Sequence, residues 1–121
     1  MAKHIMIVDD EQDVVDTLKI RLEANGYRVS SSAGSRSIKD IKNGKPDLII
    51  LDVMMPDMDG FAVMRELKRD SNLSKIPVIV LSAKPKQTMI ELFGPEGIAG
   101  YISKPFEAKQ MLELIKKTLG E

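Results

Sequence analysis

Short hydrophobic runs alternate with longer amphipathic stretches along this chain. Residues 5–8, 48–51 and 78–81 are apolar at every position. Such unbroken runs are typical of strands that are covered on both faces of a sheet. Between them, apolar residues recur every three or four positions, which is the period of an amphipathic helix. The alternation predicts a series of βαβ units.

This pattern predicts five strands and five helices. The strands are expected at about residues 4–8, 27–32, 48–51, 78–81 and 100–103, and the helices at about 11–25, 35–43, 61–69, 86–93 and after Pro105. Serines interrupt the second strand, which suggests an edge position. Gly44 and Gly94-Pro95 are expected to end the second and fourth helices, and Pro105 to lie in the first turn of the last. The strict alternation predicts a doubly wound α/β fold with a parallel sheet.

Composition and charge narrow the possible functions. The chain has 121 residues, which suits a single domain, and its 18 basic and 18 acidic residues give a formal net charge of zero. This balance argues against nucleic acid as a direct partner, because binding to a phosphate backbone relies on a basic face. Cysteine is absent and there is one histidine, which excludes disulfides, thiolate chemistry and a histidine metal cluster.

The sequence also gives no sign of membrane insertion or secretion. No apolar run approaches the roughly 18–20 residues that a membrane-spanning helix needs. The first apolar run is short and ends in two aspartates, unlike a signal peptide. We therefore expect a cytoplasmic domain that covers residues 1–121. Because the chain ends soon after the last predicted helix, we expect it to be a stand-alone protein, with a domain excised from a longer protein as the alternative.

Polar residues follow four of the predicted strands at the point where each strand ends. Asp9 and Asp10 come after the first strand, Asp52 after the third, Ser82 after the fourth and Lys104 after the fifth. Since ligands of such sheets bind beyond the carboxyl ends of the strands, we expect three carboxylates, a hydroxyl and an ammonium to converge there. This set is suited to holding a divalent cation and a phosphoryl group.

Each of these residues also has a simpler interpretation. Asp9 and Asp10 could hold magnesium, which prefers oxygen ligands, or could cap the following helix. Asp52 could be a metal ligand, a nucleophile that forms an acyl phosphate, or a turn residue. Ser82 and Lys104, taken singly, are more typical of residues without a specific role. Their joint placement at one sheet edge favours a functional site, because coincidence is improbable in so short a chain.

At these positions the sequence strongly resembles the receiver domain of two-component response regulators. The resemblance covers about residues 3–119 and rests on four motifs. They are Ile7-Val8-Asp9-Asp10-Glu11, Leu51-Asp52-Val53-Met54-Met55-Pro56-Asp57-Met58-Asp59-Gly60, Leu81-Ser82-Ala83-Lys84 and Tyr101-Ile102-Ser103-Lys104-Pro105-Phe106. The resemblance implies a flavodoxin-like sheet with strand order 2-1-3-4-5, an order that comes from the family.

The resemblance also implies a role for the acidic residues. Asp52 would be the phosphoacceptor, attacking the phosphohistidine of a sensor histidine kinase or of a phosphotransfer protein. Asp10, Asp52 and the backbone carbonyl of Met54 would bind Mg²⁺, and Asp9 would act through a bound water. Three clustered carboxylates repel one another, so we expect the site to be strained until magnesium or Lys104 neutralises it.

The remaining motif residues would bind and report the phosphoryl group. By the resemblance, Ser82 and Lys104 would hold phosphoryl oxygens, and Tyr101 would turn inward as Ser82 moves toward the phosphate. This movement would switch the surface of the fourth helix, fifth strand and fifth helix, to which a downstream protein would bind. The bond between Lys104 and Pro105 is expected to be cis, as in the family.

Two other classes of function remain open. An unphosphorylated interaction domain could keep the same fold, although the presence of every site residue weighs against it. A small magnesium-dependent phosphatase or phosphotransferase would need a substrate pocket, a second nucleophile or a general base, and none is evident beyond the cluster. The leading interpretation is a signalling switch that is not an enzyme toward external substrates, and that gains and loses its own phosphoryl group.

Overall fold

The central feature of the fold is a parallel sheet of five strands, which the computed structural model describes together with the rest of residues 2–55, 58–93 and 98–121. The strand order is β2-β1-β3-β6-β7. The strands are β1 (His4–Val8), β2 (Arg28–Ser32), β3 (Leu48–Asp52), β6 (Val78–Ser82) and β7 (Gly100–Ser103). The predicted α/β fold class, the strand order and the edge position of the second strand are confirmed.

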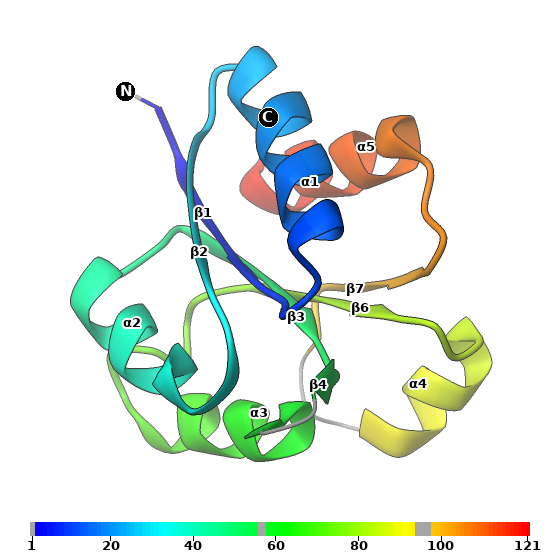
Figure 1. Ribbon diagram of the computed structural model, residues 1–121. Helices are drawn as coiled ribbons and strands as arrows, with labels where there is room; N and C mark the ends of the chain where they lie inside the picture. Colours follow the sequence, from blue (N-terminus) through cyan, green and yellow to red (C-terminus); the bar gives the residue numbers. More distant parts are fainter. Residues whose placement is uncertain (1, 56–57, 94–97) are drawn as a thin grey trace.

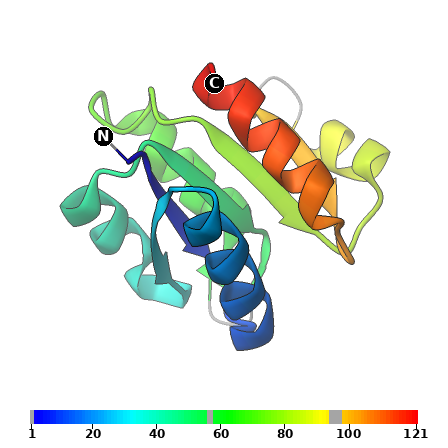
Figure 2. The ribbon, with the colours of Figure 1, turned by 90° about the horizontal axis from the view of Figure 1, so that it is seen from above.

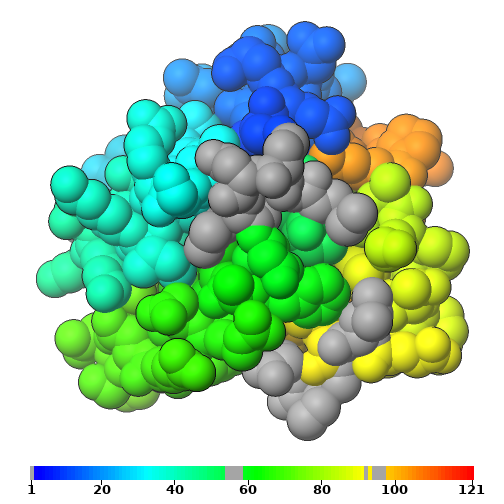
Figure 3. Space-filling model, turned by 60° about the horizontal axis from the view of Figure 1, so that its bottom comes forward, coloured from blue at the N-terminus to red at the C-terminus, as the bar shows by residue number. Residues whose placement is uncertain are grey.

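The helices cover the sheet in two layers (Figures 1 and 2). Helices α1 (Gln12–Ala24) and α5 (Ala108–Leu119) pack on one face. Helices α2 (Ser37–Gly44), α3 (Gly60–Arg69) and α4 (Lys86–Phe93) pack on the other, where Figure 3 shows them side by side. No helix in the described part of the chain is both long and apolar enough to span a membrane.

Two hydrophobic cores lie on the two faces because side chains alternate along each strand. Ile5 and Ile7 of β1 point toward the α1 and α5 layer, whereas Met6 and Val8 point toward the other three helices. All five residues of β1, β3 and β6 are buried, which explains their unbroken apolar pattern. The central strands are therefore rigid supports for the residues that follow them.

Two helix boundaries differ from the prediction. Helix α2 includes Gly44, and the left-handed residue that ends it is Lys45, with φ 45°. Gly44 instead packs closely against β1, since a Cβ there would lie 3.0 Å from the end of the Met6 side chain. Helix α5 begins at Ala108 after an extended Glu107, so Pro105 lies before the helix rather than in its first turn. The predicted helix end at Gly94-Pro95 lies outside the described residues.

The segment after β3 contains a small hairpin that the sequence pattern did not predict. Strand β4 (Met54–Met55) pairs antiparallel with β5 (Met58–Asp59), and α3 follows directly. Asp59 caps α3 by accepting a hydrogen bond of 2.8 Å from the backbone N–H of Phe61. Asp57 of the second motif lies outside the described residues. A further short 3₁₀ turn, η1 (Gly34–Arg36), precedes α2.

Candidate functional site

The registers of the central strands bring the polar residues to one edge of the sheet. Val8 of β1 pairs with Leu51 of β3, so Asp9 and Asp52 follow at the same level. The backbone N–H of Asp9 also donates to Ser32 at the end of β2, over 3.1 Å. On the other side, Asp52 pairs with Leu81 of β6, which places Ser82 next along the edge.

Three carboxylates form a cluster at this edge. Asp9, Asp10 and Asp52 each offer one oxygen, and these oxygens all lie within 4.8 Å of one another. Asp9 is 4% exposed and Asp52 is 2% exposed, whereas Asp10 faces solvent. Like charges this close repel, and the burial of two of them removes water that would otherwise screen the repulsion. The cluster therefore requires a cation.

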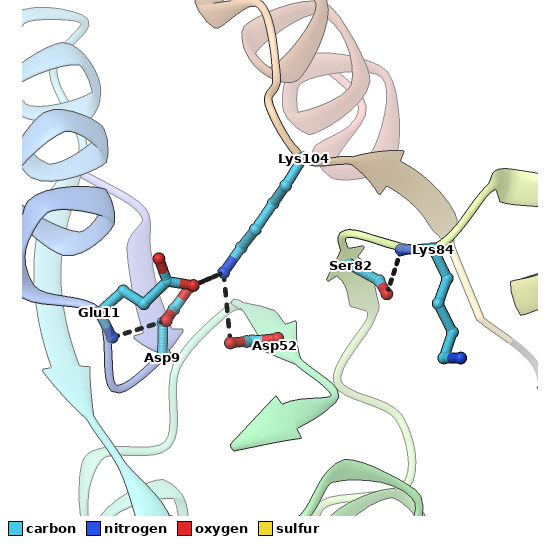
Figure 4. A network of polar contacts seen from close by, with 6 residues as sticks. All are labelled: Asp9, Glu11, Asp52, Ser82, Lys84 and Lys104. Atoms are coloured by element: carbon cyan, nitrogen blue, oxygen red, sulfur yellow. Dashed lines mark hydrogen bonds and ion pairs between the residues drawn. The ribbon is translucent and has the colours of Figure 1, made fainter. Parts of the chain in front are cut away.

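The Lys104 ammonium supplies one positive charge to the cluster (Figure 4). Its Nζ lies 3.1 Å from Asp9 Oδ2, 3.3 Å from Asp52 Oδ2 and 2.6 Å from Glu11 Oε1. The backbone N–H of Lys104 donates to the carbonyl of Ser82 over 2.6 Å, which ties the start of this segment to the end of β6. The Lys104-Pro105 peptide bond is cis, as predicted.

The electrostatics of Asp9 and Lys104 reflect this crowding. Burial raises the pKa of Asp9 from 3.8 to about 6, helped by the Asp52 charge and opposed by the Glu11 backbone N–H and Lys104. Burial alone would lower the pKa of Lys104, but Glu11, Asp9 and Asp52 together raise it above its ordinary value. Lys104 is therefore a permanent cation, whereas ionisation of Asp9 is unfavourable in the folded protein.

The donor set fits a hard divalent cation. Asp9 Oδ2 is buried and accepts no hydrogen bond from the described residues, although it faces the Lys104 charge. Carboxylate oxygens are the ligands that Mg²⁺ prefers, and one or two of them with bound waters usually suffice. Met54, the predicted carbonyl ligand, lies two residues after Asp52 at the start of β4, with its backbone paired to Asp59.

The hydroxyl of Ser82 lies at the predicted edge of the sheet, but it is hydrogen-bonded to the loop that follows β6. Ser82 is fully buried, and its Oγ accepts a hydrogen bond of 3.0 Å from the backbone N–H of Lys84. Figure 4 shows this contact on the side of Ser82 away from Lys104. The structure thus brings together the three aspartates and Lys104 as expected, while the Ser82 hydroxyl points to its own loop.

Tyr101, the predicted switch residue, is half-buried in β7. Its ring lies 6.3 Å from that of Phe93 between centroids, and Phe93 stacks on Phe61 at 4.4 Å. Burial raises the pKa of the Tyr101 hydroxyl, so it is neutral at ordinary pH. The Tyr101 ring therefore packs the C-terminal end of α4 against the sheet.

The sequence pattern gave no role to Glu11, although it belongs to one of the four motifs. Glu11 precedes α1 and makes the shortest contact to Lys104. The available signal was a third acid directly after the Asp9-Asp10 pair, at a strand-to-helix turn on the edge where Lys104 was expected.

Comparison with known sequences decides the family. Residues 5–116 match the sequence profile of the response regulator receiver domain. The chain belongs to this family. Among curated relatives of this receiver domain, the alkaline phosphatase synthesis transcriptional regulatory protein PhoP of Bacillus subtilis is 36% identical over 121 residues, covering 98% of the chain and 49% of PhoP. The receiver domain spans about half the length of the curated relatives it matches.

Solved structures agree with this assignment. A putative response regulator from Chloroflexus aurantiacus has a TM-score of 0.92 to the receiver domain, with 25% identity and full coverage of both chains. The receiver domain of sensor histidine kinase PA1611 from Pseudomonas aeruginosa has a TM-score of 0.88 with 24% identity, also over both whole chains. That structure has a magnesium ion coordinated in its active-site cleft. The predicted family and its flavodoxin-like fold are confirmed.

Proposed function

We propose that this receiver domain accepts a phosphoryl group on Asp52, in a magnesium-dependent reaction, from the phosphohistidine of a sensor histidine kinase or of a phosphotransfer protein. The observation that carries the proposal is that Asp52 lies close to both the Asp9-Asp10 pair and the Lys104 ammonium. Asp52 Oδ2 lies 3.3 Å from Lys104 Nζ, at the carboxyl end of the central strand β3. A carboxylate held there has a cation beside it to stabilise phosphoryl oxygens.

The reaction needs a nucleophile and charge neutralisation rather than a general base. A carboxylate oxygen of Asp52 forms a bond to phosphorus as the bond from phosphorus to the donor's imidazole nitrogen breaks. The electron pair of that bond stays on the imidazole. A carboxylate nucleophile, unlike a hydroxyl, needs no general base to activate it. Lys104 stabilises the negative charge on the transferred oxygens, which is the main contribution a protein makes to phosphoryl transfer.

Asp9, Asp10 and Asp52, with the backbone carbonyl of Met54, would hold the magnesium ion, Asp9 through a bound water. When bound, the ion would neutralise the carboxylates and the phosphoryl oxygens. The buried Asp9 Oδ2, which faces the Lys104 charge without a hydrogen bond from the described residues, and the mutual proximity of the three carboxylates support this assignment. The magnesium ion in the cleft of the PA1611 receiver domain, which has the same fold, is consistent with it.

The phosphoryl group would act as a switch through Ser82 and Tyr101. For its hydroxyl to reach the phosphoryl group, Ser82 must give up the hydrogen bond from Lys84. Its movement would make room for Tyr101, whose ring already contacts Phe93 of α4. The α4-β7-α5 surface would then change and bind a downstream protein. We further propose that residues 1–121 form a single receiver domain that works in the cytoplasm and has no enzymatic role beyond its own phosphorylation and dephosphorylation.

The decisive test is intact mass after incubation with magnesium and a small acyl-phosphate donor, for the wild type beside Asp52→Asn. We expect a gain of one phosphate in the wild type, none in the variant, and none when magnesium is chelated. No gain in the wild type, together with no magnesium binding, would favour an unphosphorylated interaction domain. Release of many product molecules per protein would instead indicate a phosphatase or phosphotransferase.

A further inference from the structure

The closest partner of Lys104 lies outside the three-aspartate cluster. Lys104 Nζ is 2.6 Å from Glu11 Oε1, compared with 3.1 Å to Asp9 Oδ2 and 3.3 Å to Asp52 Oδ2. Figure 4 shows the Glu11 side chain meeting the ammonium beside Asp9, while Asp52 lies beyond. The ammonium is therefore shared between the phosphoacceptor and a carboxylate that the proposed reaction does not use.

The position of the Glu11 side chain allows it to separate from Lys104. It is 59% exposed, whereas the side chains of Asp9 and Asp52 are 1% and 3% exposed. Glu11 occupies the N-cap position of α1, but its side chain makes no capping hydrogen bond. Its local contacts are made by the backbone, whose N–H donates to Asp9 Oδ1 over 2.9 Å. The carboxylate can therefore move without disturbing the turn or the helix.

We propose that Glu11 is a positioning residue that holds the Lys104 ammonium before phosphorylation and must release it when a phosphoryl group occupies Asp52. The inference rests on the proposed function, in which Lys104 binds phosphoryl oxygens. A lysine has three N–H donors, and those turned toward Glu11 are lost to the incoming group. Glu11 thus competes with the phosphoryl oxygens for Lys104 and sets how readily the site fills.

The competition between Glu11 and the phosphoryl oxygens should change the affinity for a phosphoryl group by a predictable amount and in a predictable direction. An ion pair with an exposed partner is weak, so the release of Lys104 from Glu11 changes binding only modestly. We expect Glu11→Gln to bind a phosphoryl mimic about two- to fivefold more tightly than the wild type. The measurement is a fluoride titration with beryllium and magnesium fixed, because beryllofluoride on a carboxylate imitates the phosphoryl group. Glu23→Gln is the matched control, since it removes one exposed carboxylate from the same helix, remote from Lys104 in sequence.

A second measurement separates positioning from a general effect on the fold. The Lys104 Cε resonance of lysine-labelled protein reports the surroundings of the ammonium. In Glu11→Gln without beryllofluoride, this resonance should already lie closer to its position in the bound wild type, and Glu23→Gln should leave it unchanged. If the role of Glu11 were purely structural, Glu11→Gln would lower the thermal midpoint of unfolding. Its Lys104 Cε resonance would then not move toward the position seen in the bound wild type.

The outcomes distinguish this inference from the proposed function. If the wild type binds beryllofluoride and gains phosphate, but Glu11→Gln matches Glu23→Gln in affinity and in the Lys104 resonance, the role of Glu11 is overturned and the function stands. If the wild type neither binds beryllofluoride nor gains phosphate, the proposed function itself fails. Weaker binding by Glu11→Gln would also overturn the inference, because it would make Glu11 a supporter of the bound state.

Discussion

Asp9 is the residue at which the needs of the fold and of the site conflict most directly. Its carboxylate is buried beside Asp52, and burial raises its pKa from 3.8 to about 6. In the unfolded chain Asp9 ionises near pH 4, whereas in the folded chain it keeps its proton until about pH 6. The stability that this difference provides is fully present below the unfolded pKa and is lost as the pH rises through the folded one.

Replacing Asp9 with Asn should therefore stabilise the fold once the native carboxylate is ionised. Without magnesium, we expect the free energy of unfolding of Asp9→Asn to exceed that of the wild type by roughly 1–3 kcal/mol at about pH 8, and by little at about pH 4. Urea unfolding at the two pH values measures this. Asp10→Asn is the control, because Asp10 is exposed and its replacement should change stability less. A loss of stability in Asp9→Asn at the higher pH would contradict the argument.

Which residues gather at the site was predictable, but how their side chains point was not. Asp9 and Lys104 follow strands and Asp52 ends one, and parallel strands place such residues on one edge whatever their side chains do. The turn of the Ser82 hydroxyl toward Lys84 and the reach of Glu11 to Lys104 depend on side-chain rotamers. Hydrophobic periodicity carries no information on rotamers, so these two contacts required the structure.

Among the helices, α3 shows how one side chain can fix the start of an element next to the site. It begins at Gly60, directly after β5, and Asp59 caps it by accepting a hydrogen bond of 2.8 Å from the Phe61 N–H. Gly60 packs tightly against the chain after β3, since a Cβ there would lie 2.5 Å from the Cα of Val53. The cap therefore sets where the helix leaves the hairpin.

Loss of this cap should destabilise the fold measurably. We expect Asp59→Ala to lower the free energy of unfolding by about 1 kcal/mol, because the Phe61 N–H loses its partner. Asp59→Asn should retain most of the stability, since an amide oxygen can accept the same hydrogen bond. Urea unfolding at neutral pH compares the three proteins. Equal losses in the Ala and Asn variants would show that the charge of Asp59, rather than the cap, stabilises α3.

Elements were predictable where their pattern was long and uniform. Strands β1, β3 and β6 were predicted to within one residue because both faces are buried. The β4–β5 hairpin was missed because its strands have two residues each, too short to show a period of two. The start of α5 was misplaced because Pro105 is compatible with a first helical turn, although three residues, 105–107, lead into the helix instead.

At the scale of the whole molecule, the sheet connects the acidic edge to a distant surface. Ser82 ends β6, and its carbonyl accepts the backbone N–H of Lys104 just after β7. Along β7, Tyr101 contacts Phe93 of α4. A groove beside Tyr101 is lined by α4 and α5, including Lys86, Ile90 and Leu114. A change at Ser82 is thus one strand away from this groove.

This arrangement predicts that the Ser82 hydroxyl transmits phosphorylation to the α4-β7-α5 surface. In the wild type, beryllofluoride should shift backbone amide resonances at the site and in α4, β7 and α5. In Ser82→Ala the shifts around Asp52 should persist while those in the three elements shrink, because no hydroxyl is drawn toward the bound group. Ser82→Thr, which keeps a hydroxyl, should restore them.

The control for a general effect of serine removal is Ser71→Ala, an exposed loop position before β6. It should respond to beryllofluoride as the wild type does. Two results would contradict this coupling. One is shifts of full size in α4, β7 and α5 of Ser82→Ala, and the other is the loss of these shifts in Ser82→Thr as well. The first would mean that Lys104, which is bonded through its backbone to the end of β6, transmits the change instead. The second would mean that packing around Ser82, rather than its hydroxyl, links the acidic edge to the groove.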